Sequence, residues 1–160
     1  METKAFLRTG GLLLAVVFLA AWLSALHIQL LLIHGDSMAP AYRSGALVLL
    51  EKRPEALARG DVLLVRSEAM DRSLVKRVAA VEGDTLTVEG DRLLINGEDA
   101  APLPPAEDRA AFLTETPFVL PAGSLFLLGD KREASVDSRD ARVGLLSVED
   151  VRGRVCFPRR

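Results

Sequence analysis

The sequence predicts a mainly β domain, an antiparallel β-barrel or sandwich, preceded by one N-terminal transmembrane helix. Residues 9–35 contain no Lys, Arg, Asp or Glu and are rich in Leu, Ala, Val and Ile. The rest of the chain holds short Val- and Leu-rich segments separated by Gly, Pro, Asp and Asn, which is typical of antiparallel strands joined by turns. The pair Asn96-Gly97 is a strong signal for a tight hairpin.

The apolar run is long enough to cross a bilayer. A hydrocarbon core of about 30 Å needs roughly 20 apolar helical residues, so we predict a transmembrane helix over residues 9–34. Lys4 and Arg8 precede it and favour a cytoplasmic location for residues 1–8. The β domain, residues 35–160, is then extracytoplasmic, on a single-pass protein of the cell membrane. A cleaved signal peptide and a buried core helix are the alternatives, but the run is long for the first and hard for so small a domain to cover in the second.

The remaining elements follow from local composition. Residues 98–117 carry four prolines and several acidic residues, and we expect an exposed loop or a small insertion there. One helical turn is expected over Ser147–Val151. Strands are predicted over Ala46–Glu51, Asp61–Arg66, Leu74–Val81, Thr85–Val88, Arg92–Ile95, Ser124–Leu128 and Gly153–Phe157.

Composition excludes several classes of function. The net charge of −2 gives no electrostatic case for nucleic-acid binding. Cys156 is the only cysteine, so the chain has no internal disulfide, and with two histidines no Cys/His metal cluster can be assembled. We therefore predict neither a metal nor a cofactor. His27 and His34 are expected at the membrane interface rather than in catalysis.

The first candidate motif is Gly35-Asp36-Ser37-Met38-Ala39-Pro40, directly after the apolar run. A glycine two residues before a serine lets the backbone turn tightly. By itself this pattern is more often structural than catalytic.

The second motif, Leu74-Val75-Lys76-Arg77-Val78, lies on a predicted strand. Alternation points Lys76 to the apolar face and Arg77 to the other. Desolvation lowers the pKa of a lysine in such a place, and a neutral amine can take a proton from a serine. The simpler interpretation is a lysine that extends to solvent at the rim of the sheet.

The third motif is Gly129-Asp130-Lys131-Arg132-Glu133-Ala134-Ser135-Val136-Asp137-Ser138-Arg139. It follows an apolar strand and is dense in hydrogen-bonding side chains. Asp137 and Arg139 are a candidate ion pair that would brace the loop.

With these three motifs in this order after an apolar span, the chain resembles the type I signal peptidases. The resemblance implies Ser37 as nucleophile, Lys76 as general base and Ser135 as the serine that hydrogen-bonds and orients the lysine. It implies a structural ion pair of Asp137 and Arg139. It also places Met38 in the substrate groove, next to an oxyanion site where the Ser37 N–H is the expected donor. Some members carry a serine hydroxyl at the oxyanion position that is Gly35 here.

The implied activity is removal of signal peptides from exported precursors by a membrane-bound serine endopeptidase, with small residues before the cut. The partners are therefore signal peptides and the lipid bilayer. Lys131, in place of a usual asparagine, and Val143, in place of a usual aromatic residue, depart from the family pattern. A dedicated Ser–Lys maturation protease of the same superfamily and a non-catalytic membrane-tethered β module remain as alternatives.

Overall fold

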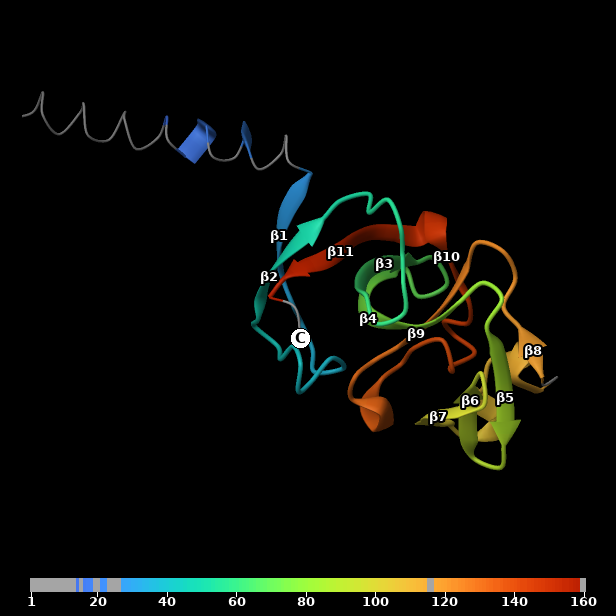
Figure 1. The fold of residues 1–160 in the computed structure, drawn as a ribbon. Coiled ribbons are helices and arrows are strands. Elements are labelled where there is room, and N and C mark those ends of the chain that lie inside the picture. Colours follow the sequence, from blue (N-terminus) through green and yellow to red (C-terminus); the bar gives the residue numbers. More distant parts are fainter. Residues whose placement is uncertain (1–13, 15, 19–20, 23–26, 115–116, 159–160) are drawn as a thin grey trace, which may run out of the picture.

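The computed structural model describes residues 14, 16–18, 21–22, 27–114 and 117–158, and its strands form two antiparallel sheets (Figure 1). The strands are β1 (Ile28–Leu32), β2 (Leu47–Glu51), β3 (Val62–Ser67), β4 (Arg72–Val81), β5 (Thr85–Glu89), β6 (Arg92–Ile95), β7 (Glu98–Pro102), β8 (Phe118–Val119), β9 (Ser124–Leu128), β10 (Leu146–Ser147) and β11 (Val151–Phe157). Short 3-10 helices are η1 (Ala106–Asp108), η2 (Ala111–Thr114), η3 (Arg132–Ala134) and η4 (Val148–Asp150).

The larger sheet has the order β1-β2-β11-β3-β4-β9-β10, and every neighbouring pair is antiparallel. Its order ends at β1 on one side and at β10 on the other, so among the described residues it is an open sheet. The predicted antiparallel β architecture is confirmed, whereas the closed barrel is not formed. β4 lies in the interior of this sheet, which fixes the lysine motif on a well-supported strand.

The smaller sheet has the order β7-β6-β5-β8 and lies at one end of the molecule (Figure 1). β5 follows β4 after a turn at Glu82-Gly83. Leu86 and Leu93 of the small sheet share one apolar cluster with Phe126 and Leu128 of β9. The two sheets are therefore joined by a common core.

Part of the predicted transmembrane helix is a strand. Residues 14, 16–18 and 21–22 are helical and exposed and extend away from the β domain (Figure 1), but Ile28–Leu32 pairs with Leu47–Glu51 over five residues. The Lys52 N–H also donates a hydrogen bond of 2.7 Å to the His27 carbonyl. A short apolar run is compatible with either a helix or a strand. Residues Ile28–Leu32 form a strand because they pair with β2. The other residues of the predicted span lie outside the described residues.

Among the described residues, no helix combines the length and the apolar character needed to cross a membrane.

Residues 98–117 were predicted to form an exposed loop or a small insertion, and their described part is not a simple exposed loop. This segment contributes strand β7 and the helices η1 and η2, and it buries Ala101, Ala110 and Leu113. Pairing of β7 with β6 and apolar contacts across the small sheet override the proline-rich composition. All seven predicted strands are present with ends shifted by at most two residues, and the predicted helical turn is η4. Strands β1, β7, β8 and β10 were not predicted.

Candidate active site

The predicted nucleophile lies in a hydrogen-bonded turn after β1. The Ala39 N–H donates to the Asp36 carbonyl at 3.0 Å, and the Tyr42 N–H donates to the Met38 carbonyl at 2.8 Å. Gly35 has φ +85°, a conformation that favours glycine, as expected from its place before Ser37. The buried Met38 side chain packs in the core beneath the turn. These contacts hold Ser37 in a defined position at the surface.

The predicted base approaches Ser37 from β4. Leu74, Lys76, Val78 and Ala80 are all buried, which confirms the predicted alternation. The Lys76 side chain is 3% exposed, and its Nζ donates a hydrogen bond of 2.8 Å to Ser37 Oγ. The fold thus brings together two side chains that are 39 residues apart in sequence.

The surroundings of Lys76 favour its neutral form. The pKa of Lys76 is lowered from 10.5 to about 8, chiefly by burial, and the charges of Arg72 and Arg139 contribute in the same direction. The carboxylates of Asp137 and Asp130 act in the opposite direction. Burial is the largest of these influences, because a charged amine loses most of its hydration inside the protein.

The third motif packs directly against the nucleophile turn. The Lys131 N–H donates a hydrogen bond of 3.0 Å to the Ser37 carbonyl. A Cβ at Gly129 would lie 2.1 Å from Ser135 Oγ and 2.7 Å from the Ser37 carbonyl oxygen, so a side chain cannot fit there without displacement. Because Lys131 contributes this bond through its backbone, its departure from the family pattern leaves the contact unchanged.

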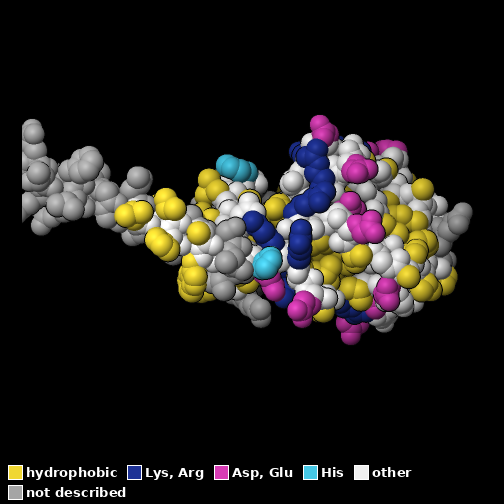
Figure 2. Space-filling view, turned by 90° about the horizontal axis from the view of Figure 1, so that it is seen from above, with side chains coloured by type: hydrophobic (Ala, Val, Ile, Leu, Met, Phe, Trp, Pro, Cys, Tyr) yellow, Lys and Arg dark blue, Asp and Glu magenta, His cyan; other side chains and the backbone are white. Residues whose placement is uncertain are grey.

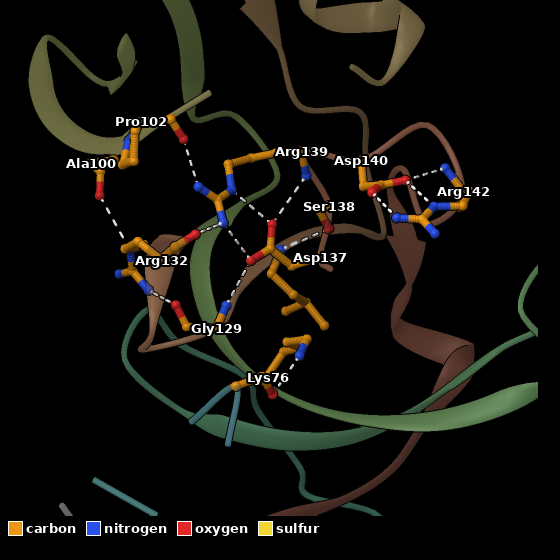
Figure 3. Close-up of polar contacts among 12 residues, drawn as sticks. Lys76, Ala100, Pro102, Gly129, Arg132, Asp137, Ser138, Arg139, Asp140 and Arg142 are labelled. Carbon is orange, nitrogen blue, oxygen red and sulfur yellow. Dashed lines mark hydrogen bonds and ion pairs between the residues drawn. The ribbon is translucent and has the colours of Figure 1, made fainter. Parts of the chain in front are cut away.

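Asp137 and Arg139 form the predicted ion pair, and both are buried (Figure 3). Arg139 donates to both Asp137 oxygens, at 2.8 and 2.9 Å, and Asp137 Oδ2 also accepts from the Gly129 N–H at 2.9 Å. Arg139 further donates to the Pro102 carbonyl at 2.5 Å. The pair therefore stabilises the loop of the third motif and links this loop to β7 of the smaller sheet.

Ser135 lies in the site without its predicted hydrogen bond. Its Oγ is buried and has no hydrogen-bond partner among the described residues. Lys76 donates to Ser37 instead. Ser135 lines a separate cavity of about 310 Å³ together with Arg132 and Arg139. Tertiary packing places it beside Gly129, but the hydrogen bond to Lys76 is not present in this structure.

A second ion pair was not predicted. Arg77 donates to the two Asp130 oxygens at 2.8 and 2.7 Å, and its third nitrogen donates to the Gly60 carbonyl at 2.8 Å. Arg77 follows Lys76, and Asp130 precedes Lys131, which holds the Ser37 carbonyl. The sequence did contain opposite charges in the second and third motifs. Which of them form an ion pair depends on how β4 and β9 align, and the sequence does not show this.

A groove of about 440 Å³ runs past the two central side chains. One wall is the segment 33–38, which includes Gly35, Ser37 and Met38, and the other is 72–76, which includes Lys76. The predicted groove residues Gly35 and Met38 both contribute to its lining. The groove is open to solvent and can receive an extended peptide next to Ser37.

The family described as signal peptidase, peptidase S26, matches residues 6–159. The chain belongs to this family. As a member of the signal peptidase family, it is a serine endopeptidase, and the match includes all three motifs.

Individual relatives cover nearly the whole chain. Signal peptidase I T of Bacillus subtilis (strain 168) is 29% identical over 98% of this chain and 86% of its own length. Signal peptidase I of Bacillus licheniformis is 30% identical over 92% of this chain and 84% of its own length. A solved structure of a signal peptidase I from Enterococcus faecalis V583 aligns with a TM-score of 0.47 and 23% identity, covering 62% of this chain and 97% of that chain.

Proposed function

We propose that this signal peptidase cleaves signal peptides from exported precursors with a dyad of Ser37 and Lys76. The observation that carries the proposal is the 2.8 Å contact between Lys76 Nζ and Ser37 Oγ beside an open groove. A pKa of about 8 for Lys76 supports the role of a base, because about a tenth of the amine is neutral at pH 7 and about half at pH 8.

In the proposed reaction, neutral Lys76 takes the proton of the Ser37 hydroxyl as Ser37 Oγ attacks the scissile carbonyl. Collapse of the tetrahedral intermediate breaks the C–N bond, and Lys76 gives its proton to the leaving amine. An acyl-enzyme ester on Ser37 remains. Lys76 then takes a proton from a water molecule, the hydroxide attacks the ester, and the proton returns to Ser37.

The Ser37 N–H is the proposed oxyanion donor. No hydrogen bond from this N–H to another described residue occupies it. Gly35, on the same turn, offers no side-chain hydroxyl, so backbone donors carry this role. A rigid turn suits it, because preorganised donors need no rearrangement when charge develops on the oxygen.

The free edge of β4 supports binding of an extended substrate. β3 pairs with β4 from Arg72 onward, but β9 joins only from Arg77. Residues 72–76 thus have one edge without a strand partner within the described part of the chain, and they line the groove. A peptide can add to such an edge through backbone hydrogen bonds. The family resemblance implies small residues at the first and third positions before the cut.

We further propose that residues 9–26 anchor the enzyme in the membrane, with residues 1–8 cytoplasmic and the β domain outside. The described residues of this segment present hydrophobic side chains on a narrow projection from the domain (Figure 2). The short distance in sequence from β1 to Ser37 would keep the groove near the bilayer surface, where a signal peptide emerges.

The test is cleavage of a precursor with an Ala-x-Ala site by the full chain in detergent or vesicles. Ser37→Ala and Lys76→Ala should each lower the rate by at least about a thousandfold. Ser124→Ala and Lys52→Ala, matched substitutions outside the groove, should retain activity. Equal cleavage by all variants would refute the assigned roles, and cleavage of one precursor from a broad panel would indicate a dedicated maturation protease.

A further inference from the structure

An arginine at one end of the groove forms no ion pair with the carboxylates that the structure describes. Arg72 is the first residue of β4 and lines the same groove as Ser37 and Lys76. Its guanidinium contacts the Met70 sulfur at 3.8 Å and makes no ion pair with a described Asp or Glu. The neighbouring carboxylate, Asp71, is already paired with Arg66 of β3. The charge of Arg72 is therefore available to a ligand.

Arg72 lies on the face of β4 that carries Lys76. Residues two and four apart on a strand share one face, and four residues span about 13 Å at roughly 3.3 Å per residue. The charge of Arg72 lowers the pKa of Lys76, which indicates that its field reaches the reacting groups.

The opposite wall does not neutralise this charge. Its titratable side chains are His34 and Asp36. Asp36 Oδ1 accepts a hydrogen bond of 3.3 Å from the Ser44 N–H, which holds the carboxylate in its own turn. The end of the groove that is farther from Lys76 therefore carries the positive charge of Arg72.

From this arrangement we propose that Arg72 is a specificity-determining residue that favours precursors with Asp or Glu about four residues from the cleaved bond. The inference rests on the proposed function, because it assumes that the substrate lies extended along residues 72–76 with its scissile bond at Ser37. A substrate strand beside β4 advances at the same rise per residue, so the fourth residue from the cut comes level with Arg72. Lys or Arg at that substrate position is disfavoured by like charge.

The effect belongs mainly to binding. The carboxylate meets Arg72 in the bound substrate and is far from the scissile carbonyl, so it should change KM more than kcat. An exposed ion pair in water contributes little, and partial desolvation in an occupied groove increases it, which gives an expected preference of about 3- to 10-fold. High salt should reduce this preference.

The experiment uses the full chain in detergent with peptides that carry an Ala-x-Ala site. Glu, Gln and Lys are compared at the third, fourth and fifth positions on each side of the cut, with wild type, Arg72→Gln, Arg72→Lys and Arg72→Glu. Arg92→Gln removes an exposed arginine of the smaller sheet and serves as the matched control.

We expect wild type and Arg92→Gln to prefer Glu over Gln at one position through a lower KM. Arg72→Gln should abolish the preference, Arg72→Lys should retain most of it, and Arg72→Glu should replace it with a preference for Lys over Gln. An identical Glu-to-Gln ratio in wild type and Arg72→Gln at every position would overturn the inference while the cleavage itself upheld the proposed function. Absence of any Ser37-dependent cleavage would instead refute the proposed function.

Discussion

The active-site region buries charged side chains, whereas the smaller sheet keeps a charged pair at its surface. Lys76, Asp137 and Arg139 are each less than 5% exposed, and Arg139 is satisfied by a carboxylate and two carbonyls. The smaller sheet has an apolar core and keeps its pair of Arg92 and Asp99 at the surface, with side chains 44% and 57% exposed. A buried charge is unfavourable unless it is paired. The site region therefore keeps an ordered set of charges that stability alone would not select.

The largest contrast should come from neutralising one aspartate in each region. Asp137→Asn leaves the Arg139 cation buried without its counter-charge and should lower the free energy of unfolding by about 3–5 kcal/mol. Asp99→Asn, in the exposed pair, should change it by less than about 1 kcal/mol. Urea unfolding of the two variants in the same detergent measures the difference. Equal effects would show that burial of the Asp137 pair has no special energetic consequence.

Lys76→Met should stabilise the protein at neutral pH while abolishing activity. Below pH 8 Lys76 is charged in both the folded and unfolded states, so the folded protein bears the full burial penalty. A shift from 10.5 to about 8 corresponds to about 3 kcal/mol.

This gain should decline as the pH rises from 8 to 10.5, because the folded lysine becomes neutral first. Unfolding of Lys76→Met and wild type across pH 6–11 gives the difference, with Lys52→Met as the control. A gain that does not change with pH would arise from packing rather than from charge.

Gly129→Ala should affect stability and activity together. The added Cβ meets both Ser135 and the Ser37 backbone, so the nucleophile turn must move. Overpacking of this kind lowers the free energy of unfolding by about 1–3 kcal/mol. We also expect at least a tenfold fall in kcat with a smaller change in KM. Unchanged kcat would show that the position of Ser37 tolerates displacement by the third motif.

A smaller effect on stability than that of Gly129→Ala is expected for Arg77→Lys, which keeps the charge but loses the two-point contact with Asp130. Contacts run from Lys76 through Arg77, Asp130 and Lys131 to the Ser37 carbonyl, so loosening this pair should alter the Ser37–Lys76 separation. We expect a loss of about 1 kcal/mol in unfolding free energy and about a tenfold loss in kcat. Arg92→Lys is the matched change in an exposed pair and should leave kcat unaltered.

Local patterns predicted much of the fold. Alternation along β4 correctly placed Lys76 on the buried face, and Asn96-Gly97 marked the hairpin between β6 and β7. The strands that were missed were short or lay in composition typical of other structures. β1 is apolar enough to resemble the end of a membrane helix, and only its pairing with β2 makes it a strand. β7 lies in a proline-rich segment and is likewise defined by its pairing with β6.

The order and content of the three motifs predicted the family, which the family match confirms, and the resemblance to that family proposed Ser37 and Lys76 as the dyad. Motifs of this kind can be recognised from sequence because they are contiguous and keep their order along the chain. Tertiary structure alone decided that Arg77 pairs with Asp130, that Ser135 Oγ has no partner among the described residues, and that Arg72 lines the groove. These outcomes depend on strand register and on contacts between distant segments, which local sequence does not specify.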